Sequence, residues 1–160
     1  MWRVAAPSAT RDAWTDYVWD GKPDLGPHLL PDGRDILDEI REGRAGELPF
    51  PVQARIYQGK RINDMLWTGG LGMIASTALV AVLNDLGVAG YATYDLDVRN
   101  RDGSPLPGFV GFRTTSDTLD TDITDLGRGG SYIFYTTDRV ANALRDTKLK
   151  LDITPVTPRG

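Results

Sequence analysis

The sequence contains no cysteine and only one histidine, His28. Without cysteine, disulfide bonds and thiolate metal sites are excluded. A single histidine also excludes zinc sites that need two imidazoles from one chain, and no G-x-S-x-G motif supplies a serine nucleophile beside it. We therefore predict no metal, no cofactor and no catalytic residue, and we expect His28 to be structural or to lie on the surface.

Glutamate is also scarce, because all but three of the 22 acidic residues are aspartates and no glutamate follows Glu47. The aspartates near positions 95 and 120 have a spacing similar to that of a calcium-binding loop, but such a loop ends in a glutamate. The glycines of residues 68–72 are not followed by the lysine and hydroxyl residue of a phosphate-binding loop. We expect these glycines to form a hairpin turn.

Basic clusters are absent as well, and we expect no signal peptide. The net charge is −4, so the chain is a poor candidate for binding nucleic acid, and its partners are expected to be neutral or basic. Residues 1–7 lack a basic and then apolar pattern, which favours a cytoplasmic location.

Residues 65–84 carry no charge over the length of a membrane span, but their glycines and Ser76 favour a buried strand, turn and helix instead. We therefore predict no contact with a membrane.

A chain of 160 residues has the usual length of one domain. The pattern predicts a single α+β domain (residues 1–160) with an irregular N-terminal arm over residues 1–31, three helices, and about five or six strands that include a central hairpin. Expected helices cover residues 33–43 after a cap at Asp32, 77–86 and 138–146. Expected strands cover residues 3–5, 54–57, 91–98, 109–115, 132–135 and 150–156.

Two segments, residues 64–98 and 133–156, follow the same order of strand, hydroxyl cap, helix and strand. When Ser76 is aligned with Thr137, Leu83 falls on Leu144 and Asp85 on Asp146. This similarity predicts an internal repeat. The helix of the first segment is apolar on every side and is expected to be covered all round, whereas the second has a polar side and is expected on the surface.

Two groups of residues are candidates for binding a partner. The acidic segment around residues 118–126 could meet a basic surface. The aromatic residues near the N-terminus, which also include Tyr17, either pack into the core or anchor a partner. The predicted partner-binding residues are Asp117, Asp120, Asp122, Asp125, Trp14 and Trp19.

One portion of the sequence resembles a known family. The segments that carry the resemblance are Asp64-Met65-Leu66-Trp67, Gly72-Met73-Ile74-Ala75-Ser76, Leu79-Val80-Ala81-Val82-Leu83 and Gly87-Val88-Ala89-Gly90-Tyr91-Ala92-Thr93-Tyr94. In this order they resemble immunity-type proteins of bacterial polymorphic toxin systems, of the myxobacterial immunity type, and related uncharacterised bacterial and phage proteins. In that family a second strand, hydroxyl and helix block lies near the C-terminus, and residues 133–156 resemble it. The resemblance covers residues 64–156.

The resemblance implies a protein that is not an enzyme and that inhibits a toxin by covering it. A structural or assembly subunit, for example of a phage virion, is the alternative, and it makes self-association possible. A small enzyme or ligand-binding domain that uses aspartate and arginine is a third hypothesis, with Asp64 and Asp95 as its first candidates.

Overall fold

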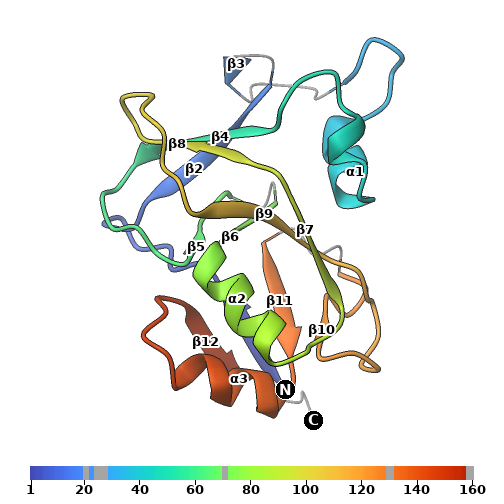
Figure 1. Ribbon diagram of the computed structural model, residues 1–160, viewed down its shortest axis with the longest axis vertical. Coiled ribbons are helices and arrows are strands. Elements are labelled where there is room, and N and C mark those ends of the chain that lie inside the picture. The colour runs from blue at the N-terminus through green and yellow to red at the C-terminus, as the bar shows by residue number, and fades with distance from the viewer. Residues whose placement is uncertain (20–21, 24–28, 70–71, 129–131, 158–160) are drawn as a thin grey trace.

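The computed structural model describes residues 1–19, 22–23, 29–69, 72–128 and 132–157. The described residues form an α+β fold with three four-stranded sheets, which follow one another along the long axis of the molecule (Figure 1). The predicted fold class is therefore confirmed, as are three helices. The expected five or six strands are too few, because several strands are only two to four residues long and give no alternating pattern to read.

We name the sheets by their place in Figure 1. The upper sheet has the order β3-β2-β4-β8, the middle sheet β5-β6-β9-β7, and the lower sheet β10-β11-β1-β12. The upper strands are β3 (Lys22–Pro23), β2 (Trp14–Trp19), β4 (Gln53–Gln58) and β8 (Asp97–Arg99). The middle strands are β5 (Met65–Leu66), β6 (Met73–Ser76), β9 (Phe109–Thr114) and β7 (Tyr91–Tyr94). The lower strands are β10 (Ile123–Thr124), β11 (Ile133–Thr136), β1 (Trp2–Ala5) and β12 (Asp152–Pro155).

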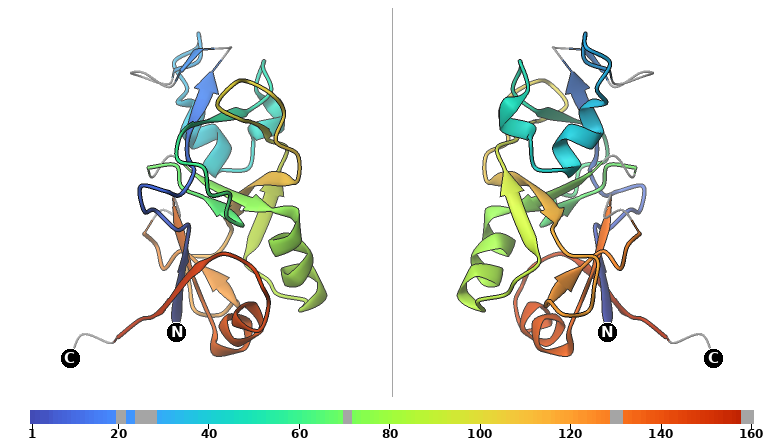
Figure 2. Two further views of the ribbon diagram at one scale, coloured as in Figure 1. Left: turned by 90° about the vertical axis from the view of Figure 1, so that its left-hand side faces the viewer. Right: turned by 90° about the vertical axis from the view of Figure 1, so that its right-hand side faces the viewer.

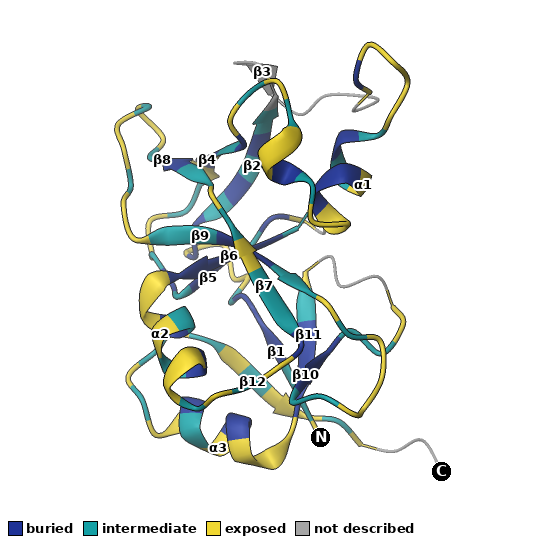
Figure 3. Ribbon diagram, turned by 45° about the vertical axis from the view of Figure 1, so that its right-hand side comes forward, coloured by how far each residue is buried: buried dark blue, intermediate teal, exposed yellow. Residues whose placement is uncertain are grey.

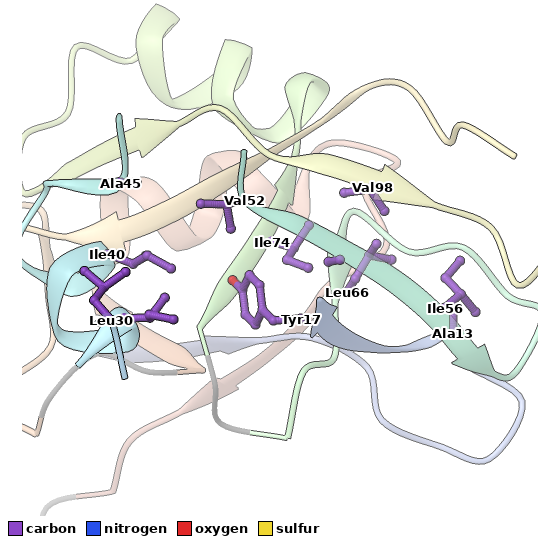
Figure 4. Packing of buried hydrophobic residues seen from close by; sticks show 12 residues of the cluster. Ala13, Tyr17, Leu30, Ile40, Ala45, Val52, Ile56, Leu66, Ile74 and Val98 are labelled. Carbon is purple, nitrogen blue, oxygen red and sulfur yellow. The ribbon is translucent and has the colours of Figure 1, made fainter. Parts of the chain in front are cut away.

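The middle sheet separates two hydrophobic cores. Successive side chains of a strand point to opposite faces, so Met73 and Ile74 of β6 enter different cores. Ile74 belongs to the upper core with Tyr17 of β2, as Figure 4 shows. Met73 belongs to the lower core with Phe112 of β9. One sheet therefore contributes to both halves of the molecule.

The first helix, α1 (Ile36–Arg41), packs against the upper core and is followed by the short 3-10 helix η1 (Ala45–Glu47). Its N-cap is Asp35, whose carboxylate accepts a hydrogen bond from the backbone N–H of Asp38. The prediction of a cap at Asp32 is wrong, because Asp32 instead accepts hydrogen bonds from Arg34 within the preceding turn.

Helices α2 (Thr77–Asp85) and α3 (Asp138–Arg145) lie on the same side of the molecule (Figure 2). As predicted, α3 is amphipathic and buries Val140, Ala141 and Leu144. The expectation that α2 is covered all round is wrong, because only Leu79 and Leu83 are buried. Its remaining apolar residues include alanines, whose small side chains expose little hydrocarbon at a helix surface.

Each of these helices joins two strands that lie on either side of a third. Strands β6 and β7 both pair antiparallel with β9, and β11 and β12 both pair antiparallel with β1. Both units are therefore split strand–helix–strand motifs. The central strands β9 and β1 come from outside the two predicted repeat segments. The internal repeat itself stays a prediction.

Two further expectations need correction. The strand expected over residues 3–5 is present as β1, which pairs with β11 and β12. The segment expected to be an irregular arm also contains β2, which was not expected and which pairs with β4. The strand expected over residues 91–98 is two strands. Its first part, β7, pairs with β9 as predicted for the hairpin, whereas β8 pairs in parallel with β4 of the upper sheet. In the described part of the chain, no helix is both long and apolar enough to cross a membrane.

Candidate protein-binding surface

The acidic loop (residues 115–126) connects the middle and lower sheets and contains β10. Hydrogen bonds between its two ends close its base. The hydroxyl of Thr124 and the backbone N–H of Asp125 both donate to the carbonyl oxygen of Ser116, each at 3.0 Å. The carboxylate of Asp125 accepts from the hydroxyl of Thr114 at 3.2 Å and from the N–H of Gly127 at 2.7 Å. These bonds hold the loop against the strand before it.

A second set of contacts attaches the loop to the start of α3. The carboxylate of Asp122 pairs with the guanidinium of Arg139 at 3.1 Å and accepts a hydrogen bond from the hydroxyl of Thr137 at 3.3 Å. The carbonyl oxygen of Asp122 accepts from Thr136 at 2.7 Å. The carboxylates of Asp122 and Asp125, two of the predicted binding residues, therefore make their contacts within the protein.

The other two acidic candidates lie at the tip of the loop. Asp117 and Asp120 are exposed, and neither makes an ion pair with any residue that the structure describes. Between them stands Leu119, which is 68% exposed, the largest exposed fraction among the large hydrophobic residues described. The tip thus presents an apolar side chain between two carboxylates. Sequence reasoning missed Leu119, although its position inside an acidic segment was a signal.

Beside the tip is a hollow of about 340 Å³ between the loop and the start of α3. Leu119, Asp122 and Asp138 are among the residues that line it. The carboxylate of Asp138 accepts from the indole N–H of Trp2 at 2.8 Å and lies 3.7 Å from the N-terminal ammonium of Met1. Both carboxylates of the hollow, Asp122 and Asp138, therefore already have partners within the protein.

Trp14 lies in an aromatic cluster rather than alone on the surface. Its ring centroid is 4.6 Å from that of Trp67 and 6.4 Å from that of Tyr57, and the residue is half-buried. Its indole N–H is buried and has no hydrogen-bond partner in the described part of the chain. Trp19 ends β2, but the surroundings of its side chain lie outside what the structure describes, and His28 lies outside the described residues altogether.

The structure does not bring the predicted binding residues into one patch. In Figure 1 the first residues of β2, which include Trp14, lie on one side of the molecule, and the loop between β9 and β10 lies on the other. A partner that covers the acidic loop does not reach Trp14 unless it wraps around the protein.

Asp64 and Asp95, the candidates of the enzyme hypothesis, differ in environment. The carboxylate of Asp64 accepts from the hydroxyl of Ser76 and from the backbone N–H of Lys150, each at 2.7 Å, so it links two distant segments of the chain. Asp95 is exposed at the rim of a large cleft. Within the described ranges, no group of three or more histidine, cysteine or acidic residues is placed to hold a metal ion.

Comparison of the sequence with models of known protein families and with curated proteins gives no match.

Proposed function

We propose that this protein acts by binding another protein through the acidic loop, as an immunity-type inhibitor that covers a toxin in the cytoplasm and is not itself an enzyme. The observation that carries the proposal is the exposed side chain of Leu119 at the tip of a loop with a closed base. It stands between two carboxylates that make no ion pair with the residues the structure describes. The family resemblance of residues 64–156 supports the choice of a toxin as the partner.

The closed base of the loop favours binding. A loop that is already ordered loses little conformational freedom when a partner docks, so more of the contact energy appears as affinity. Asp122 and Asp125 hold this base through Arg139 and Thr114. Their role in the proposed function is therefore to fix the position of the tip, and they contact the partner less than the sequence alone predicts.

The charges of the tip favour a basic partner. Exposed carboxylates attract a basic surface over distances near the Debye length and raise the association rate, especially at low salt. Leu119 then supplies apolar area at the centre of the contact.

The test compares two pairs of acidic residues. In the double variant Asp117→Asn and Asp120→Asn, the association rate with the partner toxin is expected to fall about tenfold at low salt. The matched control, Asp85→Asn with Asp146→Asn, removes the same charge from exposed ends of α2 and α3. Stopped-flow fluorescence at low and high salt measures both. Equal rates for the two double variants, or failure of the wild-type protein to neutralise the toxin, contradict the proposal.

A second candidate, an assembly subunit, is favoured by the edge of the lower sheet. Among the described strands, β12 pairs with β1 alone and lies at the edge of its sheet (Figure 2). Three of its four residues are exposed. An open edge can pair with the same strand of another copy. Sedimentation of the purified protein separates the two functions, because a monomer at high concentration argues against assembly through this edge.

A further inference from the structure

A cleft of about 1020 Å³ lies away from the acidic loop and shares no lining residue with the hollow beside it. One wall is the connection between α1 and β4, residues 43–52. The other is the chain that leaves β7 and crosses to the upper sheet as β8 (Figure 3). Apolar side chains line both walls, among them Leu48, Phe50, Leu96 and Phe109.

The strand at this cleft, β7, is the last strand of the middle sheet and has one open edge. The backbone N–H of Thr115 donates to the carbonyl oxygen of Gly90 at 2.9 Å. This bond shows which residues of β7 direct their N–H and C=O groups toward β9, because these residues alternate along an antiparallel strand. The main-chain groups of Ala92 and Tyr94 point toward β9, and those of Thr93 and Asp95 point away from it. Among the described residues, no hydrogen bond reaches the main chain of Thr93.

Two carboxylates lie at the rim of the cleft, and they differ in whether they are paired. The neighbouring carboxylate of Asp97 is held by the guanidinium of Arg99 at 2.9 Å and by the amide of Gln53 at 3.0 Å. Asp95 is exposed, and the described part of the chain provides it with no ion pair. An occupant of the cleft can therefore gain three contacts: main-chain hydrogen bonds to Thr93, apolar contact with the walls, and an ion pair with Asp95.

We propose that an extended segment of a partner protein adds to the edge of β7 as a further strand, with a lysine or arginine opposite Asp95 and an apolar side chain against Phe50 and Phe109. Strand addition explains the combination of an open main-chain edge and an apolar cleft, because the edge supplies affinity and the cleft supplies side-chain selection. This site does not depend on the proposed function of the acidic loop.

The probe is a blocked hexapeptide of alternating valine and threonine with one central arginine. It is titrated into the ¹⁵N-labelled wild-type protein at concentrations up to the millimolar range. Amide shifts are expected at Thr93 and Asp95. A peptide with glutamate in place of arginine is expected to bind about fivefold more weakly, the size of one exposed ion pair. Shifts confined to other parts of the molecule, equal affinity for the two peptides, or no shifts at all would overturn the proposal.

Two variants test the strand edge directly. Thr93→Pro removes an N–H that faces away from β9, so the ladder keeps its bonds, and proline is tolerated on edge strands. The matched variant Thr93→Val keeps this N–H. Loss of peptide binding in the first variant and retention in the second support strand addition, and equal binding contradicts it.

If Thr93→Pro does not fold, the experiment uses the wild-type protein and a peptide that is methylated at its backbone nitrogens. Weaker binding of the methylated peptide supports the proposal, and unchanged binding contradicts it.

Discussion

Glu39 is an acidic side chain inside the upper half of the molecule and is only 4% exposed. The guanidinium of Arg44 donates two hydrogen bonds to its carboxylate, at 2.7 and 2.9 Å, and Arg34 adds a third at 3.4 Å. A buried charge is tolerated when such bonds replace its water. The hydrogen bonds from Arg44 outweigh the effect of burial and lower the pKa of Glu39.

This lowered pKa predicts a pH-dependent effect of Glu39→Gln. The pKa is lower in the folded than in the unfolded state, so the carboxylate stabilises the fold above its unfolded pKa of about 4.3. The stabilisation is lost as the pH falls through the folded pKa. We expect a clear loss of unfolding free energy at pH 7 that shrinks below about pH 4.

The control for this prediction is Glu47→Gln, since Glu47 is exposed and makes no ion pair within the described residues. Urea unfolding of both variants and of the wild type between pH 3 and pH 7 gives the comparison. A loss in Glu39→Gln that is the same at every pH would show that the side chain acts through packing and not through its charge.

Single residues were predictable from the sequence only where their role is local. Ser76 was correctly identified as a cap, because a hydroxyl before an apolar helical pattern is a signal within four residues. The partner of Asp64 at Lys150 lies 86 residues away, and no spacing rule reaches that far. For the same reason the sequence did not indicate that Asp122 would be paired with Arg139.

The boundaries of α2 and α3 followed from the sequence, whereas the helix expected over residues 33–43 is shorter and covers Ile36–Arg41. The predicted bounds of α2 and α3 agree with the structure to within one residue, since caps and periodicity act locally. The covering of α2 depends on which elements pack against it, and that is decided by contacts distant in the sequence. The break between β7 and β8 has the same cause, because the N–H of Asp97 bonds to the carbonyl oxygen of Val52, the residue before β4 of the upper sheet.

The caps of the two helices give a matched prediction. The hydroxyl of Ser76 accepts from the N–H of Leu79 at 3.1 Å, whereas Thr137 makes no side-chain hydrogen bond to its helix. We expect Ser76→Ala to lower the free energy of unfolding by about 1–2 kcal/mol and Thr137→Ala by about 0.5 kcal/mol. Ser76→Ala also leaves Asp64 without its hydroxyl donor.

Urea unfolding followed by circular dichroism measures both cap variants. Equal losses for Ser76→Ala and Thr137→Ala would mean that capping geometry does not decide the difference between these helices. A larger loss for Thr137→Ala would instead assign its importance to the contact with Asp122.

At the scale of the whole molecule, the middle sheet joins the two halves. Successive side chains of β6 enter different cores. The N–H and hydroxyl of Thr15 in β2 both donate to the carbonyl oxygen of Trp67, the residue that follows β5, and so connect the upper sheet to the middle one. The sequence shows alternation in several segments, but it does not show which face belongs to which core. Two cores therefore could not be predicted from it, although a chain of this length allows them.

This arrangement predicts that the protein unfolds as one cooperative unit. Met73→Ala removes side-chain volume from the lower core, and Ile74→Ala removes it from the upper core through the next residue of the same strand. Each is expected to lower the free energy of unfolding by about 2–5 kcal/mol, with an unchanged dependence of that free energy on urea concentration.

Amide hydrogen exchange provides the sharper measurement, because β4 lies in the upper sheet and β11 in the lower. In both variants the most protected amides of β4 and β11 should lose the same protection. Loss confined to β11 in Met73→Ala and to β4 in Ile74→Ala would show that the two halves unfold separately, and that β6 does not couple them.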